Sequence, residues 1–225
     1  MQPSVIEIPV LYEDKYLLVV SKPQGLMSEP DAAGHENVAD SLIAQLGPLR
    51  GNNILRNVHR LDRPVSGALL LARKAAVLKL LTAQFAARQV AKKYWAVVSA
   101  PPSPANAELR HWLEKDNMQH KAVIYDKPRK KADEVILCYT TLHHTAGRSL
   151  LEIELVTGKY HQIRAQLAHI GSPIIGDEKY GSAEKYKPNA IALHARSLRF
   201  THPIDGQVLE VLAPVPVDSL WAAFG

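Results

Sequence analysis

NVHRLDRPVSGALLLARK, residues 57–74, joins a charged loop directly to a run of apolar residues. Pro64 disfavours a helical conformation for the residue before it, so residues 57–65 are predicted to form a loop. The short apolar run SGALLLARK that follows is typical of a buried strand. The stretch therefore predicts a polar loop that leads into the core of the protein.

The same kind of pattern can be followed outward in both directions. Asn37 and Gly47 are the predicted start and end of a helix, and Val38, Leu42 and Leu46 line one face of it. Two more helices are predicted at 75–89 and 160–171. Strands are predicted at 5–14, 15–23, 91–100, 134–144, 149–158, 190–200 and 206–214. A Pro-rich link (100–108) and a second basic loop (126–133) separate some of them. Strands outnumber helices in a mixed order, which favours an α+β fold over a doubly wound α/β sheet.

The length and composition indicate a globular protein with a sizeable core. The chain has 225 residues, 47% of them hydrophobic, and we expect a single domain over 1–225, with two lobes as the alternative. Cys138 is the only cysteine, so an intrachain disulfide and a cysteine-based zinc site are both excluded. The N-terminal sequence resembles neither a signal peptide nor a transit peptide, and the longest apolar runs are too short to span a membrane. We expect a cytoplasmic monomer.

Basic residues are concentrated in one block of the sequence. Residues 41–107 contain ten Lys or Arg and a single acidic residue, Asp62, whereas the whole chain has a formal net charge of only +5. Such a block predicts a polyanionic partner, with nucleic acid first. The alternative is a solvated positive surface that keeps the protein soluble.

Asp62 is the most informative residue of this block. It stands between Arg60 and Arg63 in the sequence, and an ion pair with either could simply organise the loop. A carboxylate on a phosphate-binding surface weakens binding, however, so its presence there favours a role in a reaction on the bound nucleic acid. Nearby arginines favour its ionised form, which could act as a nucleophile or a base.

Two further residues are candidates for the site. Arg164 falls near the start of the helix at 160–171, where a cation opposes the helix dipole, so an anionic partner is predicted for it. That partner could be a phosphate, Asp62 or a nearby Glu. Tyr94 could be a core aromatic of its strand. Alternatively it could be a stacking platform for a base, with Lys92 and Lys93 on the phosphates.

Other kinds of chemistry find little support. The ten histidines show no HExxH or comparable metal-ligand spacing, so no metal site is expected. The Gly-rich phosphate loops GxGxxG and GxxxxGK[ST] are absent from the sequence.

Five segments, in order along the chain, resemble the motifs of the RluA-type pseudouridine synthases. HRLDRPVSGALLLARK is similar to their catalytic motif, commonly written HRLDxxTSG. LYEDKYLLVVSKPQGL resembles their first motif, and KKYWAVV their tyrosine motif. TGKYHQIRAQLAHIGSPIIGDEKYG resembles their arginine motif with the Gly-Asp turn after it, and LHARSLRFTHP resembles their late strand. Together the resemblance covers roughly residues 8–215.

The resemblance implies a fold and a set of roles. The fold would be a mixed, mostly antiparallel central sheet with flanking helices and a basic cleft. Asp62 would attack the target nucleotide, Tyr94 would pack against the uracil, and Arg164 would pair with Asp62. Arg60 would enter the RNA stack as the base leaves. The other residues implied to contact RNA or to line the pocket are His59, Arg63, Lys22, Lys92, Lys93, Leu193 and His194.

The partner implied is structured RNA, a tRNA or rRNA stem–loop, and no cofactor or metal is implied. HRLDRP and SPIIGD favour the TruC-like branch that acts on tRNA. The first motif begins near residue 8, so no S4 RNA-binding domain is expected before it. Val65 replaces the usual Thr, and Lys159 stands where Arg is common, which keeps the charge but loses bidentate geometry.

The presence of one acid also bears on the reaction. A glycoside hydrolase normally uses two carboxylates, whereas an isomerisation that adds no water and keeps the base trapped is consistent with one. The alternatives are a base-excising glycosidase and an RNA-binding protein that kept the fold without the activity.

Overall fold

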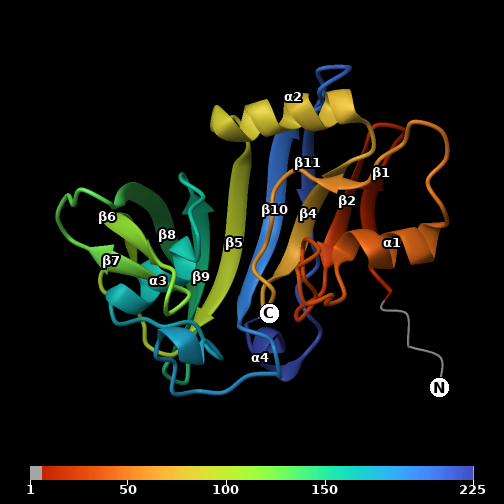
Figure 1. Cartoon of the computed structure of the whole chain (residues 1–225). Coiled ribbons are helices and arrows are strands. Elements are labelled where there is room, and N and C mark those ends of the chain that lie inside the picture. Colours follow the sequence, from red (N-terminus) through yellow and green to blue (C-terminus); the bar gives the residue numbers. More distant parts are fainter. Residues whose placement is uncertain (1–6, 225) are drawn as a thin grey trace. The chain divides into compact units, whose positions relative to one another are not determined.

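The computed structural model describes residues 7–224, and their contacts divide the chain into two compact units. The first unit comprises the chain up to Val90 together with Ala195–Pro214, and the second comprises Ala91–His194 and the chain from Val215 onward. Figure 1 labels the elements of both. The single domain expected over 1–225 stays a prediction. No helix within residues 7–224 is long and apolar enough to cross a membrane.

The first unit is a sheet with two helices. Its strands occur in the order β1, β2, β4, β10 and β11, with β3 beside β4, and the β1–β2, β2–β4, β3–β4 and β10–β11 pairs are antiparallel. The bounds are β1 Val10–Glu13, β2 Leu17–Lys22, β3 Arg56–Asn57, β4 Ser66–Ala72, β10 Leu193–Thr201 and β11 Val208–Leu212, with helices α1 Val38–Leu46 and α2 Ala75–Ala86. Strand β10 enters this unit at Ala195.

The strand predicted from residues 66–74 is the centre of this unit. All seven residues of β4 are buried, and α2 packs Val77 and Leu81 into the same core. Gly67, at a φ of +114°, allows β4 to approach β10 closely, because a β-carbon there would lie 2.3 Å from the carbonyl oxygen of Ala195. The segment 57–74 thus runs from the loop straight into the core.

Helix α1 confirms the capping prediction. The Asn37 side chain accepts a hydrogen bond from the Asp40 amide at 3.1 Å, and Gly47 ends the helix with a φ of +89°. Val38 and Leu42 are fully buried. Leu46, expected on the same face, is 45% exposed at the helix end.

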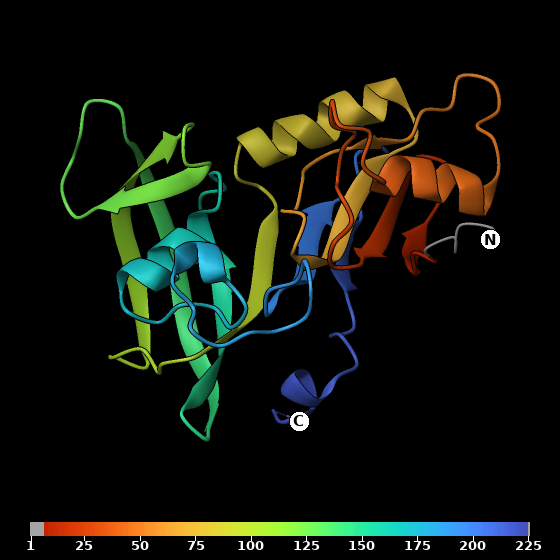
Figure 2. The same ribbon diagram turned by 60° about the horizontal axis from the view of Figure 1, so that its bottom comes forward.

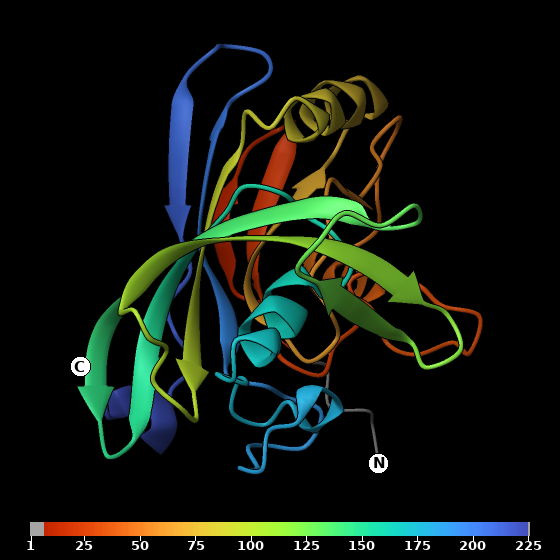
Figure 3. The ribbon, with the colours of Figure 1, turned by 90° about the vertical axis from the view of Figure 1, so that its left-hand side faces the viewer.

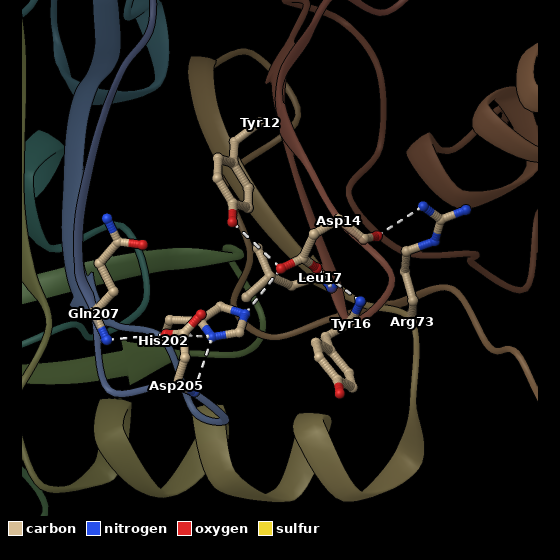
Figure 4. Close-up of polar contacts among 8 residues, drawn as sticks. All are labelled: Tyr12, Asp14, Tyr16, Leu17, Arg73, His202, Asp205 and Gln207. Atoms are coloured by element: carbon tan, nitrogen blue, oxygen red, sulfur yellow. Dashed lines mark hydrogen bonds and ion pairs between the residues drawn. The ribbon is translucent and has the colours of Figure 1, made fainter.

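A polar cluster around the buried His202 links the β1–β2 turn to the β10–β11 turn (Figure 4). The His202 ring lies between two carboxylates, with Nε2 2.9 Å from Asp14 Oδ2 and Nδ1 2.9 Å from Asp205 Oδ1. Asp14 also accepts hydrogen bonds from the amides of Tyr16 (2.7 Å) and Leu17 (2.8 Å). Burial alone would raise the pKa of the Asp14 carboxyl, but these amides and His202 bring it below its ordinary value. The cluster therefore joins residues that are 188 positions apart in the sequence.

The second unit is an antiparallel sheet in the order β5, β9, β8, β6, β7. Its strands are β5 Ala91–Val98, β6 Asn106–Asp116, β7 Lys121–Tyr125, β8 Asp133–Thr145 and β9 Arg148–Leu155. Its helical elements are α3 Gln162–His169, the 3₁₀-helix η1 Glu178–Tyr180 and α4 Ser219–Ala222. Figure 3 shows α3 lying against β6 and β7. Strands outnumber helices and most pairs are antiparallel, so the predicted α+β class is confirmed.

Strands β6 and β7 were not predicted. The Pro-rich link was expected to extend to residue 108, but β6 begins at Asn106. Only Leu109 and Leu113 of β6 are buried, and only Ala122 of β7. Strand β6 pairs with β8, β7 pairs with β6, and α3 lies against both strands. They are therefore stabilised by their neighbours, and their own residues show no clear apolar alternation.

Candidate active site

Asp62 is held by its neighbours in the first unit. Leu61 before it and Val65 after it are buried, at 6% and 3% exposed. The Val65 amide donates to the Asp62 carbonyl at 3.0 Å and closes a turn between them. The Asp62 residue itself is partly exposed. The carboxylate is therefore placed by a backbone that is anchored on both sides.

The end of the first motif and the residues just after it clamp this loop. The Ser28 hydroxyl donates to the Leu61 carbonyl at 2.7 Å and accepts from the Leu61 amide at 3.0 Å. The Gly25 amide donates to the Arg63 carbonyl at 2.9 Å, and Arg63 Nε returns a hydrogen bond of 2.9 Å to the Gly25 carbonyl. Residues on both sides of Asp62 are thus fixed to the segment 25–28.

Lys22 completes the clamp from inside. Its side chain is 0% exposed, and Nζ donates to the carbonyls of Pro23 (2.9 Å), Leu26 (2.7 Å) and Arg63 (3.2 Å). Burial lowers the pKa of Lys22 to about 7, and the Asp62 carboxylate partly opposes that shift. RNA contact by Lys22 stays a prediction. Its complete burial supports a role in positioning the loop.

The other basic residues of the motif differ in exposure. The His59 ring stacks on Phe85, with centroids 4.9 Å apart, and its Nε2 accepts from the Leu70 amide at 3.1 Å. His59 is therefore built into the join between loop and strand. Arg60 and Arg63 are exposed, as a contact to RNA requires. RNA binding by all three stays a prediction.

Tyr94, Lys92 and Lys93 lie on β5, in the second unit. Tyr94 is 7% exposed and stands opposite Ile153 of β9. Lys93 and Trp95 share one face, as predicted, because both contact Glu152: Lys93 Nζ at 2.7 Å and Trp95 Nε1 at 3.4 Å. Lys93 thus already has an anionic partner within the protein, and contacts of Lys92 and Lys93 to RNA phosphates stay predictions.

Arg164 has the anionic partner that the helix dipole required. It is the third residue of α3, and its Nε and Nη2 donate to Asp177 Oδ2 (2.7 Å) and Oδ1 (2.9 Å). Both side chains are buried, at 6% and 1% exposed. Asp177 was not among the three partners considered from sequence, although the Gly-Asp turn of the arginine motif contains it. Pairing of Arg164 with Asp62 in the other unit stays a prediction.

Tyr180 packs against this ion pair and is itself held in place by hydrogen bonds. The Tyr180 ring lies 5.1 Å from the Arg164 guanidinium. The Tyr180 hydroxyl accepts from the Ala122 amide at 2.7 Å and contacts His161 Nδ1 at 2.9 Å. Burial raises the pKa of Tyr180 to about 12, so the phenol is neutral at pH 7. Arg164 is thus enclosed by an acid on one edge and an aromatic ring on one face.

Leu193 and His194 are both buried in the second unit, at 3% and 1% exposed. The His194 ring meets Trp221 of α4 edge-on, with centroids 6.0 Å apart. Both side chains are thus part of the packed interior, His194 beside α4, and their role as a pocket wall stays a prediction.

One group of side chains could be mistaken for a metal site. His111, Asp126 and His169 bring one ligand atom each within 4.8 Å of the others. However, Gln166 Nε2 faces His111 Nδ1 at 3.0 Å, and its Oε1 already accepts from Gln162. Neutral His111 then carries its proton on Nε2, the atom that a metal would need, whereas ligating histidines donate through the other nitrogen. The donor set therefore does not fit a metal.

Comparisons with known proteins agree with the motifs. Residues 16–169 match the family model described as RNA pseudouridylate synthase. "Uncharacterized RNA pseudouridine synthase YlyB" of Bacillus subtilis is 33% identical over 218 residues, which cover 95% of this chain and 71% of that protein. "Ribosomal large subunit pseudouridine synthase D" of Xanthomonas campestris is 36% identical over 234 residues, which cover 96% and 68%.

Solved structures show the same fold. "Human RNA Pseudouridylate Synthase Domain Containing 4" is 25% identical with a TM-score of 0.76, over 93% of this chain and 89% of that one. "Human RNA Pseudouridylate Synthase Domain Containing 1" is 24% identical with a TM-score of 0.80, over 100% and 89%. The chain belongs to the RNA pseudouridylate synthase family. It is an isomerase that acts on uridine in RNA, as the RluA-type motifs implied.

Proposed function

We propose that this enzyme converts a specific uridine in a stem–loop of rRNA or tRNA to pseudouridine, with Asp62 as the nucleophile. The observation that carries the proposal is the clamp on the catalytic loop. It anchors the backbone on both sides of Asp62 and leaves that residue partly exposed. Placement of the nucleophile within a fraction of an ångström is what such a reaction needs.

The chemistry is a rearrangement within one nucleotide. The N1–C1′ bond breaks, the uracil turns, and a C5–C1′ bond forms; C5 loses its proton and N1 gains one. Asp62 assists the departure of the base, and Tyr94 packs against the uracil and takes the C5 proton late in the reaction. Because a uracil inside a stem cannot be reached, the nucleotide must first be flipped out, at a cost of a few kcal/mol that basic contacts offset.

The identity of the RNA is a separate question. The motif strings favour the tRNA branch, and that stays a prediction. Several relatives carry the name "Ribosomal large subunit pseudouridine synthase", which supports large-subunit rRNA as the first substrate to test. A cytoplasmic location and a monomeric state also stay predictions.

The test compares RNA from cells with and without the gene, mapped for pseudouridine by carbodiimide labelling and primer extension. We expect one or a few positions to disappear, and to return with the wild-type gene but not with Asp62→Ala. Purified protein on transcribed rRNA and tRNA gives the direct assay. Release of free uracil in place of pseudouridine would show a glycosidase, and binding with neither product would show a protein without the activity.

A further inference from the structure

The loop between β7 and β8 presents an unusual run of exposed cations. Its sequence over residues 126–133 is DKPRKKAD, and Lys127, Arg129, Lys130 and Lys131 are all exposed. The loop belongs to the second unit and is drawn in green in Figure 2. A charged loop is often only a solvated surface, so the neighbours of these cations decide between solvent and a ligand.

The two acids of this loop are engaged elsewhere. Asp126 Oδ1 lies 2.7 Å from His169 Nε2, at the end of α3. Asp133 Oδ2 lies 2.8 Å from Lys159 Nζ, in the segment before α3. Both carboxylates are thus drawn toward α3 and its approach. The two acids that flank the loop in the sequence therefore do not neutralise the cations between them.

Several cations elsewhere in the second unit do have acidic partners. Such pairs are Lys93–Glu152, Arg110–Glu108, Arg110–Glu134, Arg148–Glu184 and Lys187–Asp218. Within residues 7–224, Lys127, Lys130 and Lys131 have no carboxylate within ion-pair distance. Like charges so close together repel one another, and a polyanion relieves that repulsion. The loop differs from these sites in that three such lysines lie within five residues of one another.

The loop also has some internal order. The Arg129 guanidinium lies over the Tyr125 ring, 4.3 Å from its centroid, at the end of β7. The Ala132 amide donates to the Arg129 carbonyl at 3.1 Å, which closes a turn around Lys130 and Lys131. Arg129 therefore anchors the loop to the strand, while the two lysines occupy the turn.

We propose that Lys127, Lys130 and Lys131 bind phosphates of the substrate RNA outside the reacting nucleotide. The inference rests on the proposed function and adds to it a contact with the RNA backbone. Such a contact contributes affinity but does not recognise the base sequence. Each phosphate that a cation neutralises releases counterions, which makes the affinity depend on salt. The loop thus contributes part of the salt dependence of RNA binding.

The experiment compares two triple variants of the full chain with the same change of charge. The loop variant is Lys127→Gln, Lys130→Gln and Lys131→Gln, which keeps Arg129 on its strand. The matched control is Lys15→Gln, Lys185→Gln and Arg199→Gln, three exposed cations spread over both units. Binding to a fluorescein-labelled RNA stem–loop of about 25 nucleotides is measured from about 50 to 300 mM salt.

The plot of log association constant against log salt has a negative slope, and we expect it to be less steep by about 2 for the loop variant. Kd should rise about 10- to 100-fold at moderate salt. The control should change the slope by less than about 0.5. The rate at saturating RNA should stay within about 2-fold of wild type, since the loop contributes affinity and not chemistry. Equal slopes in the two variants would overturn the inference, as would a loop variant that lost binding to anionic phospholipid vesicles and kept its affinity for RNA.

These outcomes are distinct from a failure of the proposed function. If the wild type isomerises uridine and both variants bind alike, the loop contact is wrong and the function stands. If the loop variant loses its salt slope but the wild type forms no pseudouridine in any transcribed rRNA or tRNA, the contact stands and the function fails.

Discussion

Among residues 7–224, each unit of the molecule buries one lysine or arginine, and the two are satisfied in different ways. Lys22 of the first unit donates to three neutral carbonyl oxygens. Arg164 of the second unit donates twice to the Asp177 carboxylate and lies against the Tyr180 ring. Carbonyls match the three donors of an ammonium but carry no full charge, so burial lowers the Lys22 pKa to about 7 although Asp62 opposes the shift.

The difference shows how each unit uses its cation. An arginine beside a buried carboxylate stays charged at all accessible pH values and has a fixed geometry. A lysine held by carbonyls acts as a cross-link between backbone segments, and it can lose its proton near neutral pH. The first arrangement suits a group that must face an anion, and the second suits a scaffold for Asp62.

The largest effect is expected for the group that the Lys22 scaffold holds. Asp62→Asn keeps the shape of the side chain and removes the proposed nucleophile, so turnover should fall by about 10⁴-fold or more. RNA affinity should stay within a few-fold, because the carboxylate opposes phosphate binding. Pseudouridine formation and RNA binding are measured in parallel, with the partly exposed Asp31→Asn as the control. Activity retained by a pure Asp62→Asn preparation would remove Asp62 from the mechanism.

The charged arrangement is tested at Asp177. Asp177→Asn leaves the Arg164 guanidinium buried beside a neutral group, so the free energy of unfolding should fall by about 3 kcal/mol and kcat by about 10²-fold. The double variant Arg164→Met with Asp177→Leu removes both charges and should regain much of the stability without regaining activity. If stability and kcat recovered together, Asp177 would contribute to folding alone.

The neutral arrangement is tested at Lys22. In the unfolded chain Lys22 holds its proton up to about pH 10, whereas in the folded protein its pKa is about 7. Between these values the unfolded state binds more protons, so the contribution of Lys22 to the free energy of unfolding rises with pH and is constant below pH 7.

Lys22→Met lacks this titration. The stability difference between wild type and variant should therefore grow by about 2 kcal/mol from pH 7 to 10, less than the full pKa shift allows, because three carbonyls also favour the charged form. Denaturant unfolding at several pH values measures it. A difference that did not change with pH would mean that Lys22 keeps its proton throughout.

The smallest effect is expected for an exposed cation. Arg60→Ala should change the free energy of unfolding by no more than about 0.5 kcal/mol, because the side chain lies at the surface. It should slow turnover by about 10-fold and weaken RNA binding by about 2- to 3-fold, if Arg60 fills the stack when the base leaves. Uniformly weaker binding with a smaller salt slope would make Arg60 a phosphate contact only.

The sequence predicted these two cations to different degrees. The position of Arg164 in the first turn of a helix predicted an anionic partner, because a cation there opposes the helix dipole. Asp177 is that partner. The sequence did not identify Asp177 as this partner, because only the turn at Gly176 brings Asp177 back beside α3. A β-carbon at Gly176 would lie 2.6 Å from Tyr186 Cβ, so this turn depends on the packing of a later segment.

Lys22 gave no sign of burial. A lysine before a Pro-Gln-Gly turn is normally exposed, and its three acceptors are backbone carbonyls that only the folded loop brings together. By contrast, α1 and β4 were correctly predicted because their signals are local: a cap at Asn37, and an unbroken apolar run from residue 68 to residue 72. Elements that depend on partners far along the chain, such as β6 and β7, were missed.

The first unit is discontinuous, since β10 and β11 come from residues 195–214 and lie beside strands made from the first 72 residues. During synthesis the N-terminal segment leaves the ribosome before β10, the strand that pairs with β4, has been made. His202, the partner of Asp14, is also still missing at that stage. The second unit has nearly all of its strands and α3 within one continuous stretch, residues 91–194. The order of translation therefore allows the sheet of the second unit to form before the first unit, which carries Asp62, has its last two strands, β10 and β11.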